Sequence, residues 1–196
     1  MATTAAPFGF QPVAHLSGTP RPIRMPFGIT SGLGSNIFKY QPIKLSSGLI
    51  VPVTATSDKI FGVFAGVEFT PTGGRPTVSP YWPSGQTYLS TEDMNVYFWP
   101  AWDPNTRFSC QATAAVAQAS MGKEFNISAA TAGSTATGLS AAAVDATPVS
   151  TSSQGQFFLA EFGTGVQDQY GGNDTYTDLI VGIAYPQVGN GFQTSI

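Results

Sequence analysis

Residues 58–85 constrain the fold of this chain more than any other stretch. Between residues 59 and 69, apolar side chains occur at every second position: Phe61, Val63, Ala65, Val67 and Phe69. This period of two predicts a β-strand, because successive side chains of a strand point to opposite faces. Residues 70–76 supply the prolines and glycines of a turn, and residues 77–82 return as a second strand. The stretch therefore predicts a β-hairpin with one continuous apolar face toward a core.

The other face of the first predicted strand contains two glycines. Gly62 and Gly66 alternate there with Ile60, Phe64 and Glu68. A glycine inside a strand usually marks a bulge, a sharp bend or a close approach of another backbone. Such features favour a strongly bent sheet, as in a small barrel.

Similar strand and turn patterns cover most of the chain. Further strands are predicted at residues 35–45, 49–55, 95–99, 107–113, 124–128, 155–162 and 177–185. The 22 glycines and 15 prolines among 196 residues favour turns over helices. We therefore expect an all-β fold, either a small β-barrel or a sandwich, with an extended N-terminal arm and a loop-rich C-terminal β section.

The sequence divides into four predicted regions. Residues 1–26 form an extended N-terminal arm, 27–120 a β-barrel-like domain, 121–186 a C-terminal β section and 187–196 a tail. Five prolines in the arm exclude a helix there, because proline fixes φ and lacks the backbone N–H. Residues 129–153, rich in Ala, Ser and Thr, have few large apolar side chains and are expected to form a long surface loop.

The arm carries most of the residues that we expect to contact a partner. Four of them are apolar and two are basic: Phe8, Phe10, Val13, Leu16, Arg21 and Arg24. Because apolar side chains are costly to leave in water, the arm is expected to dock on a neighbouring chain. The alternative is that the arm packs back on its own domain. Tyr81 and Trp82 in the hairpin are expected to add to the partner contact.

Charged residues make up only 10% of the chain and are unevenly distributed. Four basic residues and no acidic residue precede Asp58, so the N-terminal part suits an acidic partner. These basic residues are too dispersed for phosphate binding, so no nucleic acid is expected. We also expect synthesis in a cytoplasm and no membrane partner, since neither a secretory signal nor an apolar run of membrane-spanning length is visible.

The sequence offers little for catalysis or metal binding. His15 is the only histidine and no Gly-x-Ser-x-Gly motif is present, so a serine hydrolase is not expected. The single cysteine, Cys110, is expected to be a buried structural thiol. Asp174 and Asp178 lack the spacing of a calcium-binding loop. We therefore expect no enzymatic activity, no metal and no cofactor.

The order of several landmarks along the chain resembles one known family. These landmarks are Phe8-Gly9-Phe10, residues 60–67 (IFGVFAGV), Tyr81-Trp82-Pro83, Asp103-Pro104 followed by Phe108 and Gln111, and residues 178–181 (DLIV). In this order they resemble the head decoration, or cement, proteins of tailed bacteriophages. The resemblance implies a β-barrel-like fold, no catalysis and a multimer on the outer surface of the virion capsid. Its implied partner is the major capsid protein, whose neighbouring subunits the protein would bridge and stabilise.

Two further expectations concern ligands and self-association. Five aromatic residues suit stacking on sugar rings, so a glycan-binding virion or tail module is the alternative function: Tyr81, Trp82, Tyr97, Trp99 and Trp102. The simpler interpretation is that these rings fill a core or a subunit interface. Because short strands with little charge leave sheet edges unprotected, we expect self-association, with a homotrimer as first choice and a dimer as second.

Overall fold

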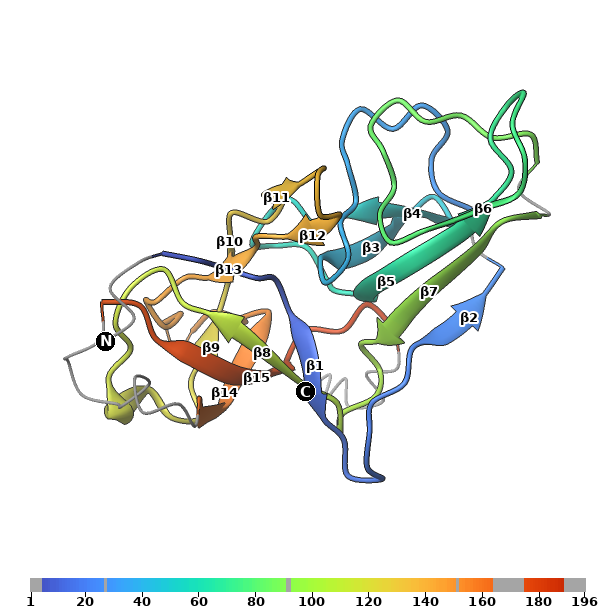
Figure 1. Cartoon of the computed structure of the whole chain (residues 1–196). Helices are drawn as coiled ribbons and strands as arrows, with labels where there is room; N and C mark the ends of the chain where they lie inside the picture. Colours follow the sequence, from blue (N-terminus) through green and yellow to red (C-terminus); the bar gives the residue numbers. More distant parts are fainter. Residues whose placement is uncertain (1–4, 27, 91–92, 151, 164–174, 189–196) are drawn as a thin grey trace.

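The computed structural model describes residues 5–26, 28–90, 93–150, 152–163 and 175–188. Their regular structure is almost entirely β-strand, and none of these residues lies in an α-helix. Most strands belong to two antiparallel sheets, which occupy the upper right and the lower left of Figure 1. The prediction of an all-β fold is confirmed.

The larger sheet has six strands in the order β2-β7-β5-β3-β4, with β6 paired to β5. Its strands are β2 (Ile23–Met25), β3 (Pro42–Ser46), β4 (Leu49–Pro52), β5 (Gly62–Phe69), β6 (Thr77–Ser79) and β7 (Asn95–Pro100). Strand β5 pairs with β7 along one edge and with β3 and β6 along the other. The predicted hairpin is therefore confirmed as β5 and β6, with β5 in the middle of the sheet.

A bulge in β5 turns the two halves of the strand toward different cores. The register with β7 shifts between Phe64 and Gly66, which leaves Ala65 as the extra residue. Val63 packs in one hydrophobic cluster, whereas Val67 packs with Phe64 in the other. The prediction of one continuous apolar face is wrong, because one inserted residue reverses the face of every residue that follows it.

The two glycines of β5 have two of the roles that the sequence left open, a bulge and a close approach. Gly66 lies at the bulge, where its φ of 156° is a conformation that other residues rarely adopt. Gly62 allows close packing against β7, since a Cβ atom there would lie 2.6 Å from the carbonyl oxygen of Trp99 and 2.7 Å from Cδ2 of Phe98. The bulge and the close approach both depend on the absence of a side chain.

The second sheet has five strands in the order β1-β8-β15-β14-β9. They are β1 (Gln11–Ala14), β8 (Arg107–Gln111), β15 (Asp178–Ile183), β14 (Phe157–Phe162) and β9 (Glu124–Phe125). Two short strand pairs are β10 (Ile127–Ser128) with β13 (Ala143–Val144), and β11 (Gly133–Ser134) with β12 (Leu139–Ser140). The five-stranded sheet thus combines strands from the arm, the central region and the C-terminal section.

Two hydrophobic clusters form the core. The first contains residues of both sheets, among them Val63, Trp99 and Phe108, and therefore lies between them. The second lies on the other face of the six-stranded sheet, where the loop residue Trp82 packs against Phe69 of β5. No sheet formed by the described strands closes on itself. Of the two expected architectures, the sandwich is correct and the barrel is wrong.

Residues 129–153 are more structured than the sequence indicated. They contain β11, β12 and β13, and Ala142, Ala143 and Val144 are buried. Small side chains are required here because the chain packs closely, and a Cβ atom at Gly133 would collide with the ring of Phe38. The prediction of a surface loop is wrong for this part of the segment.

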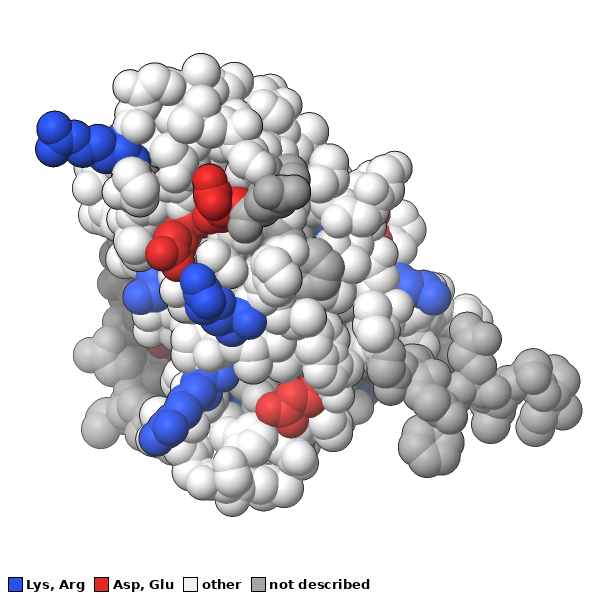
Figure 2. All heavy atoms as spheres, turned by 90° about the vertical axis from the view of Figure 1, so that its right-hand side faces the viewer, with Lys and Arg blue, Asp and Glu red and all other residues white. Residues whose placement is uncertain are grey.

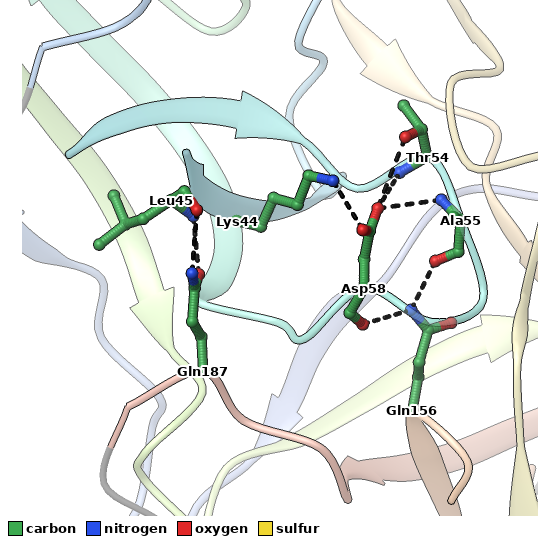
Figure 3. A network of polar contacts seen from close by, with 7 residues as sticks. All are labelled: Lys44, Leu45, Thr54, Ala55, Asp58, Gln156 and Gln187. Atoms are coloured by element: carbon green, nitrogen blue, oxygen red, sulfur yellow. Dashed lines mark hydrogen bonds and ion pairs between the residues drawn. The ribbon is translucent and has the colours of Figure 1, made fainter. Parts of the chain in front are cut away.

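A polar network around Asp58 lies beside β3 (Figure 3). One carboxylate oxygen pairs with Nζ of Lys44 at 2.6 Å, and the other accepts the backbone N–H groups of Thr54 and Ala55, each at 3.0 Å. Burial raises the pKa of Asp58, but the hydrogen bonds from Lys44 and the two amides outweigh it, so the pKa lies below its ordinary value. Asp58 is therefore charged and fully hydrogen-bonded at neutral pH.

Two glutamines connect the C-terminal section to this region. The side-chain amide of Gln156 donates to the carbonyl oxygens of Ala55 and Asp58, at 3.1 and 2.8 Å. Gln187 exchanges two hydrogen bonds with the backbone of Leu45, at 2.7 and 2.9 Å. Gln156 directly precedes β14 and bonds to the segment before β5, and Gln187 follows β15 and bonds to Leu45 in β3. These bonds therefore link the two sheets.

Candidate functional site

The arm packs on its own chain, which was the second of the two alternatives. Phe10 is fully buried, and its ring stacks on that of Phe157 with centroids 4.3 Å apart. Its backbone N–H donates to the carbonyl oxygen of Tyr40 at 2.9 Å. Phe10 was expected to contact a partner, but it forms part of the core of its own chain. Arm residues buried in this way are positioned by the two sheets rather than by another protein.

The arm is fixed over most of its described length. The backbone N–H of Ala6 donates to Oε1 of Gln111 at 2.8 Å. Gly9 has a φ of 75°, and a Cβ atom there would lie 2.8 Å from the carbonyl oxygen of Tyr40. Phe8, the other expected aromatic anchor, is half-buried. The arm is extended, as expected, and it forms strands β1 and β2, which pair with β8 and β7 of the same chain.

Four of the expected contact residues remain exposed, and all lie between residues 13 and 24. Val13 is 47% exposed, and Leu16, at 86%, has the largest exposed fraction among the large hydrophobic side chains of the described residues. Arg21 and Arg24 are also exposed. The connection between β1 and β2 projects beyond both sheets at the bottom of Figure 1. We call residues 13–24 the docking segment.

His15, the only histidine of the chain, joins the β1–β2 connection to the turn between β7 and β8. Nε2 of His15 lies 3.0 Å from Oδ2 of Asp103, in the turn between β7 and β8. On the other side of the ring, Nδ1 lies 2.6 Å from Oγ of Ser17 and accepts the Ser17 backbone N–H at 3.1 Å. The carbonyl oxygen of His15 accepts the N–H of Gly18 at 2.9 Å. Together these contacts fix the turn that presents Leu16.

Ser17, His15 and Asp103 have the residue types of a nucleophile, a base and an acid. However, Nδ1 of His15 already accepts the backbone N–H of Ser17, as expected for a short turn closed by a side chain. Asp103 is similarly engaged in its own turn, where Oδ1 accepts the N–H of Asn105 and Oδ2 accepts the hydroxyl of Thr106. We therefore interpret the contacts of Ser17, His15 and Asp103 as structural, because they hold two turns together. In the sequence, the one sign of this contact is a lone histidine in a proline-rich arm.

The basic residues of the docking segment have different surroundings. Nη2 of Arg24 lies 3.3 Å from Oε2 of Glu68, an exposed pair of the kind that adds little to stability. Arg21 lines a polar hollow of about 380 Å³ together with His15 and Asp103. Figure 2 shows acidic and basic side chains next to one another left of centre, on a surface that is mostly uncharged. Of the two arginines in the docking segment, Arg21 is the one that lines a recess.

The aromatic residues divide between core and surface. Trp82 is fully buried and Trp99 is 6% exposed, whereas Tyr81, Tyr97 and Trp102 are half-buried. Trp82 was expected to touch a partner, but its side chain is covered by its own chain. Tyr81 remains partly accessible. The core interpretation is therefore correct for the two most buried rings, which are not free to stack on a sugar.

The other candidate residues show no chemical site in the part of the chain that the structure describes. Cys110 is fully buried, and burial, followed by the nearby Asp178 carboxylate, raises the pKa of its thiol, so the predicted structural thiol is confirmed. No three His, Cys, Asp or Glu side chains among the described residues are grouped as metal ligands. Asp174 lies outside the described residues. None of the described helical segments is long and apolar enough to cross a membrane.

Comparisons with protein-family models, with curated proteins and with solved structures found no match. We therefore infer function from the sequence and from the geometry of the docking segment. Its main features are an exposed leucine at the tip, a fixed turn beneath it and an arginine beside a polar recess.

Proposed function

We propose that this protein is a non-enzymatic structural component of a bacteriophage virion. It sits on the outer surface of the capsid and stabilises it by bridging neighbouring major capsid subunits. The observation that carries the proposal is the 86% exposure of Leu16 at the tip of a projecting, fastened connection. The order of landmarks that resembles the head decoration proteins supports the same assignment.

The docking segment has the properties of a preformed binding element. Exposed Val13 and Leu16 each gain free energy when a partner removes them from water. Because the His15–Asp103 contact already orders the connection, less conformational entropy is lost on binding. Arg21 then matches an acidic side chain on the partner, as expected for a chain with four basic residues before its first acidic one.

Self-association would multiply these contacts. Among the described strands, β1 pairs with β8 alone in its sheet, so no described strand covers its outer edge. A homotrimer would place three docking segments on one assembly and raise the avidity for a curved shell. Light scattering on the purified protein should give about three times the chain mass of 20.5 kDa. Twice that mass would favour the dimer, and a monomer would contradict self-association.

Sedimentation with empty phage heads tests the docking proposal. Native protein should co-sediment with heads, and Leu16→Ala should weaken binding by about 1–3 kcal/mol, roughly 5- to 150-fold. The matched control is Leu89→Ala, since Leu89 is 61% exposed and lies outside the docking segment. Both variants should keep the native unfolding temperature. Equal occupancy of heads by the two variants would show that Leu16 is not an anchor.

A further inference from the structure

The first part of the arm, residues 5–18, is bound by residues far along the chain. Strand β1 pairs with β8 at the edge of the five-stranded sheet, and the ring of Phe10 stacks on that of Phe157 in β14. Before these contacts, the backbone N–H of Ala6 donates to the side chain of Gln111 at 2.8 Å. All of these partners lie in the second half of the chain. The rest of the molecule therefore forms a binding surface for residues 5–18, which we call the arm site.

The turn at the end of this segment belongs to the same unit. The backbone N–H of Gly18 donates to the carbonyl oxygen of His15 at 2.9 Å, which closes the turn. The His15 ring then lies 3.0 Å from the carboxylate of Asp103, which belongs to the arm site. Residues 5–18 thus form one segment that ends in a closed turn and includes the exposed Leu16.

A short connection, residues 19–22, joins this segment to β2. Thr19, Arg21 and Pro22 are exposed, and residues 19–21 make no hydrogen bond to other described residues. Since Thr19 and Arg21 each precede a proline, their backbones favour an extended conformation. Figure 1 shows that the connection runs outside both sheets, between the ends of β1 and β2. The segment is therefore attached to the rest of its own chain by a short, exposed hinge.

We propose that neighbouring copies of this chain exchange residues 5–18, so that the arm site of each copy holds the segment of another copy. The arm site itself selects this occupant. A segment of identical sequence makes the same strand pairing, ring stacking and His15–Asp103 contact, whichever copy supplies it. The closed and exchanged forms differ only in the path of residues 19–22. The local concentration of copies therefore decides between the two forms.

The inference rests on the self-association proposed above and names the contact that joins the copies. Copies side by side on a shell have a high effective concentration, which favours exchange. Reciprocal exchange joins a dimer, and exchange in one direction around a ring joins a trimer. Because residues 19–22 span only about 13 Å when extended, the exchanging copies must also touch. Leu16 stays at the tip of the same turn in both forms, so its role in docking is retained.

Mixed disulfides test the exchange in the full-length protein. Gln11 is directly opposite Ser109 in the β1–β8 pair, and the Cα separation of about 4.5–5.5 Å in such pairs suits a disulfide. One protein carries Gln11→Cys and the other Ser109→Cys, each with Cys110→Ala, so neither chain can form this bond within itself. The two proteins are unfolded, mixed in equal amounts, refolded together at high concentration and oxidised. Peptide mass spectrometry then measures the bonds between positions 11 and 109.

We expect up to about half of the Gln11→Cys chains to carry the mixed bond, since random exchange places half of their segments on Ser109→Cys chains. The matched control replaces Ser109→Cys by Ser57→Cys, because Ser57 is exposed and lies outside the β1–β8 pair. It should give background bonds only. A yield with Ser109→Cys no higher than this background would overturn the exchange.

A single chain with both Gln11→Cys and Ser109→Cys verifies the geometry. At low concentration, where the closed form is favoured, the bond should form within the monomer. Failure to form this bond would contradict the β1–β8 pairing on which the exchange depends.

The length of the hinge provides an independent test. Inserting four Gly/Ser residues after Thr19 lets each segment return more easily to its own arm site, so the mixed bonds should decrease at least about five-fold. Thermal unfolding verifies that this variant is folded. An unchanged yield of mixed bonds would show that residues 19–22 are not the hinge.

The same samples separate the exchange from the proposed function. An oligomer in light scattering without mixed bonds would overturn the exchange and leave self-association in place. A monomer without mixed bonds would contradict both. Co-sedimentation with phage heads tests the capsid assignment separately, because it does not depend on which copy supplies each segment.

Discussion

The ring of Phe10, near the start of the chain, stacks on the ring of Phe157 in β14, with their centroids 4.3 Å apart. This contact places the N-terminal arm inside the core that the two sheets share. It also separates two roles within the arm, since Phe10 supports folding whereas Leu16 is free to contact a partner.

Phe10→Ala should lower the free energy of unfolding by about 3–5 kcal/mol, because it removes a buried ring and leaves a cavity. Urea denaturation followed by tryptophan fluorescence measures the change. Leu16→Ala is the control within the arm and should change stability by less than about 0.5 kcal/mol. Equal effects of the two substitutions would contradict the division of the arm.

Gly62→Ala should destabilise the protein by about 1–3 kcal/mol, since the new methyl group would overlap the Trp99 carbonyl oxygen and the Phe98 ring. Gly34→Ala is the matched control, because nothing lies within 4 Å of a Cβ atom at that position. Thermal unfolding of both variants tests the close approach of β5 and β7. A Gly62→Ala protein as stable as the control would show that this approach is looser.

Asp58 should make stability depend on pH in the acid range. The pKa of Asp58 is lower in the folded state than in the unfolded state, so its charged carboxylate stabilises the folded protein. This stabilisation is fully present above the unfolded pKa of about 3.9 and is lost as the pH falls through the lower pKa of the folded state. Asp58→Asn should lower the free energy of unfolding by about 1–3 kcal/mol at neutral pH, because it removes the charge that pairs with Lys44. This difference from the native protein should shrink below about pH 4. A difference that stays constant from neutral to acid pH would contradict the role of the charge.

Cys110 should not react with a thiol reagent in the folded protein. The residue is fully buried and the pKa of its thiol is raised, so both access and the reactive thiolate are lacking. Ellman's reagent at mildly alkaline pH should detect the thiol only after denaturant is added. Rapid labelling of the native protein would show that the core around β8 opens.

Short-range pattern was sufficient for the prediction of the fold class and of its central element. The alternation in β5 and the turn residues before β6 are local features, so the hairpin follows from the sequence. The strand glycines predicted a bulge, a bend or a close approach, and the structure assigns the bulge to Gly66 and the close approach to Gly62. The burial of Cys110 was predicted from its strand-like setting, which shows no sign of an activated thiol. The sequence does not show which face of the sheet each residue after the bulge occupies, because one inserted residue reverses the alternation of faces.

The docking segment was only partly predictable. Phe10 and Leu16 are both large apolar residues in one proline-rich arm, and nothing in their local sequence distinguishes the buried residue from the exposed one. The same holds for Trp82, which loops of the same chain cover.

The sequence by itself determined that the chain forms short strands, where it turns, and which strand positions exclude a side chain, because these depend on backbone geometry within a few residues. Only the tertiary structure decided which apolar side chains of the arm are buried, and that His15 meets Asp103. Those outcomes depend on contacts between residues far apart in the chain. Such contacts form when β1 pairs with β8 and β2 pairs with β7, which no local pattern specifies.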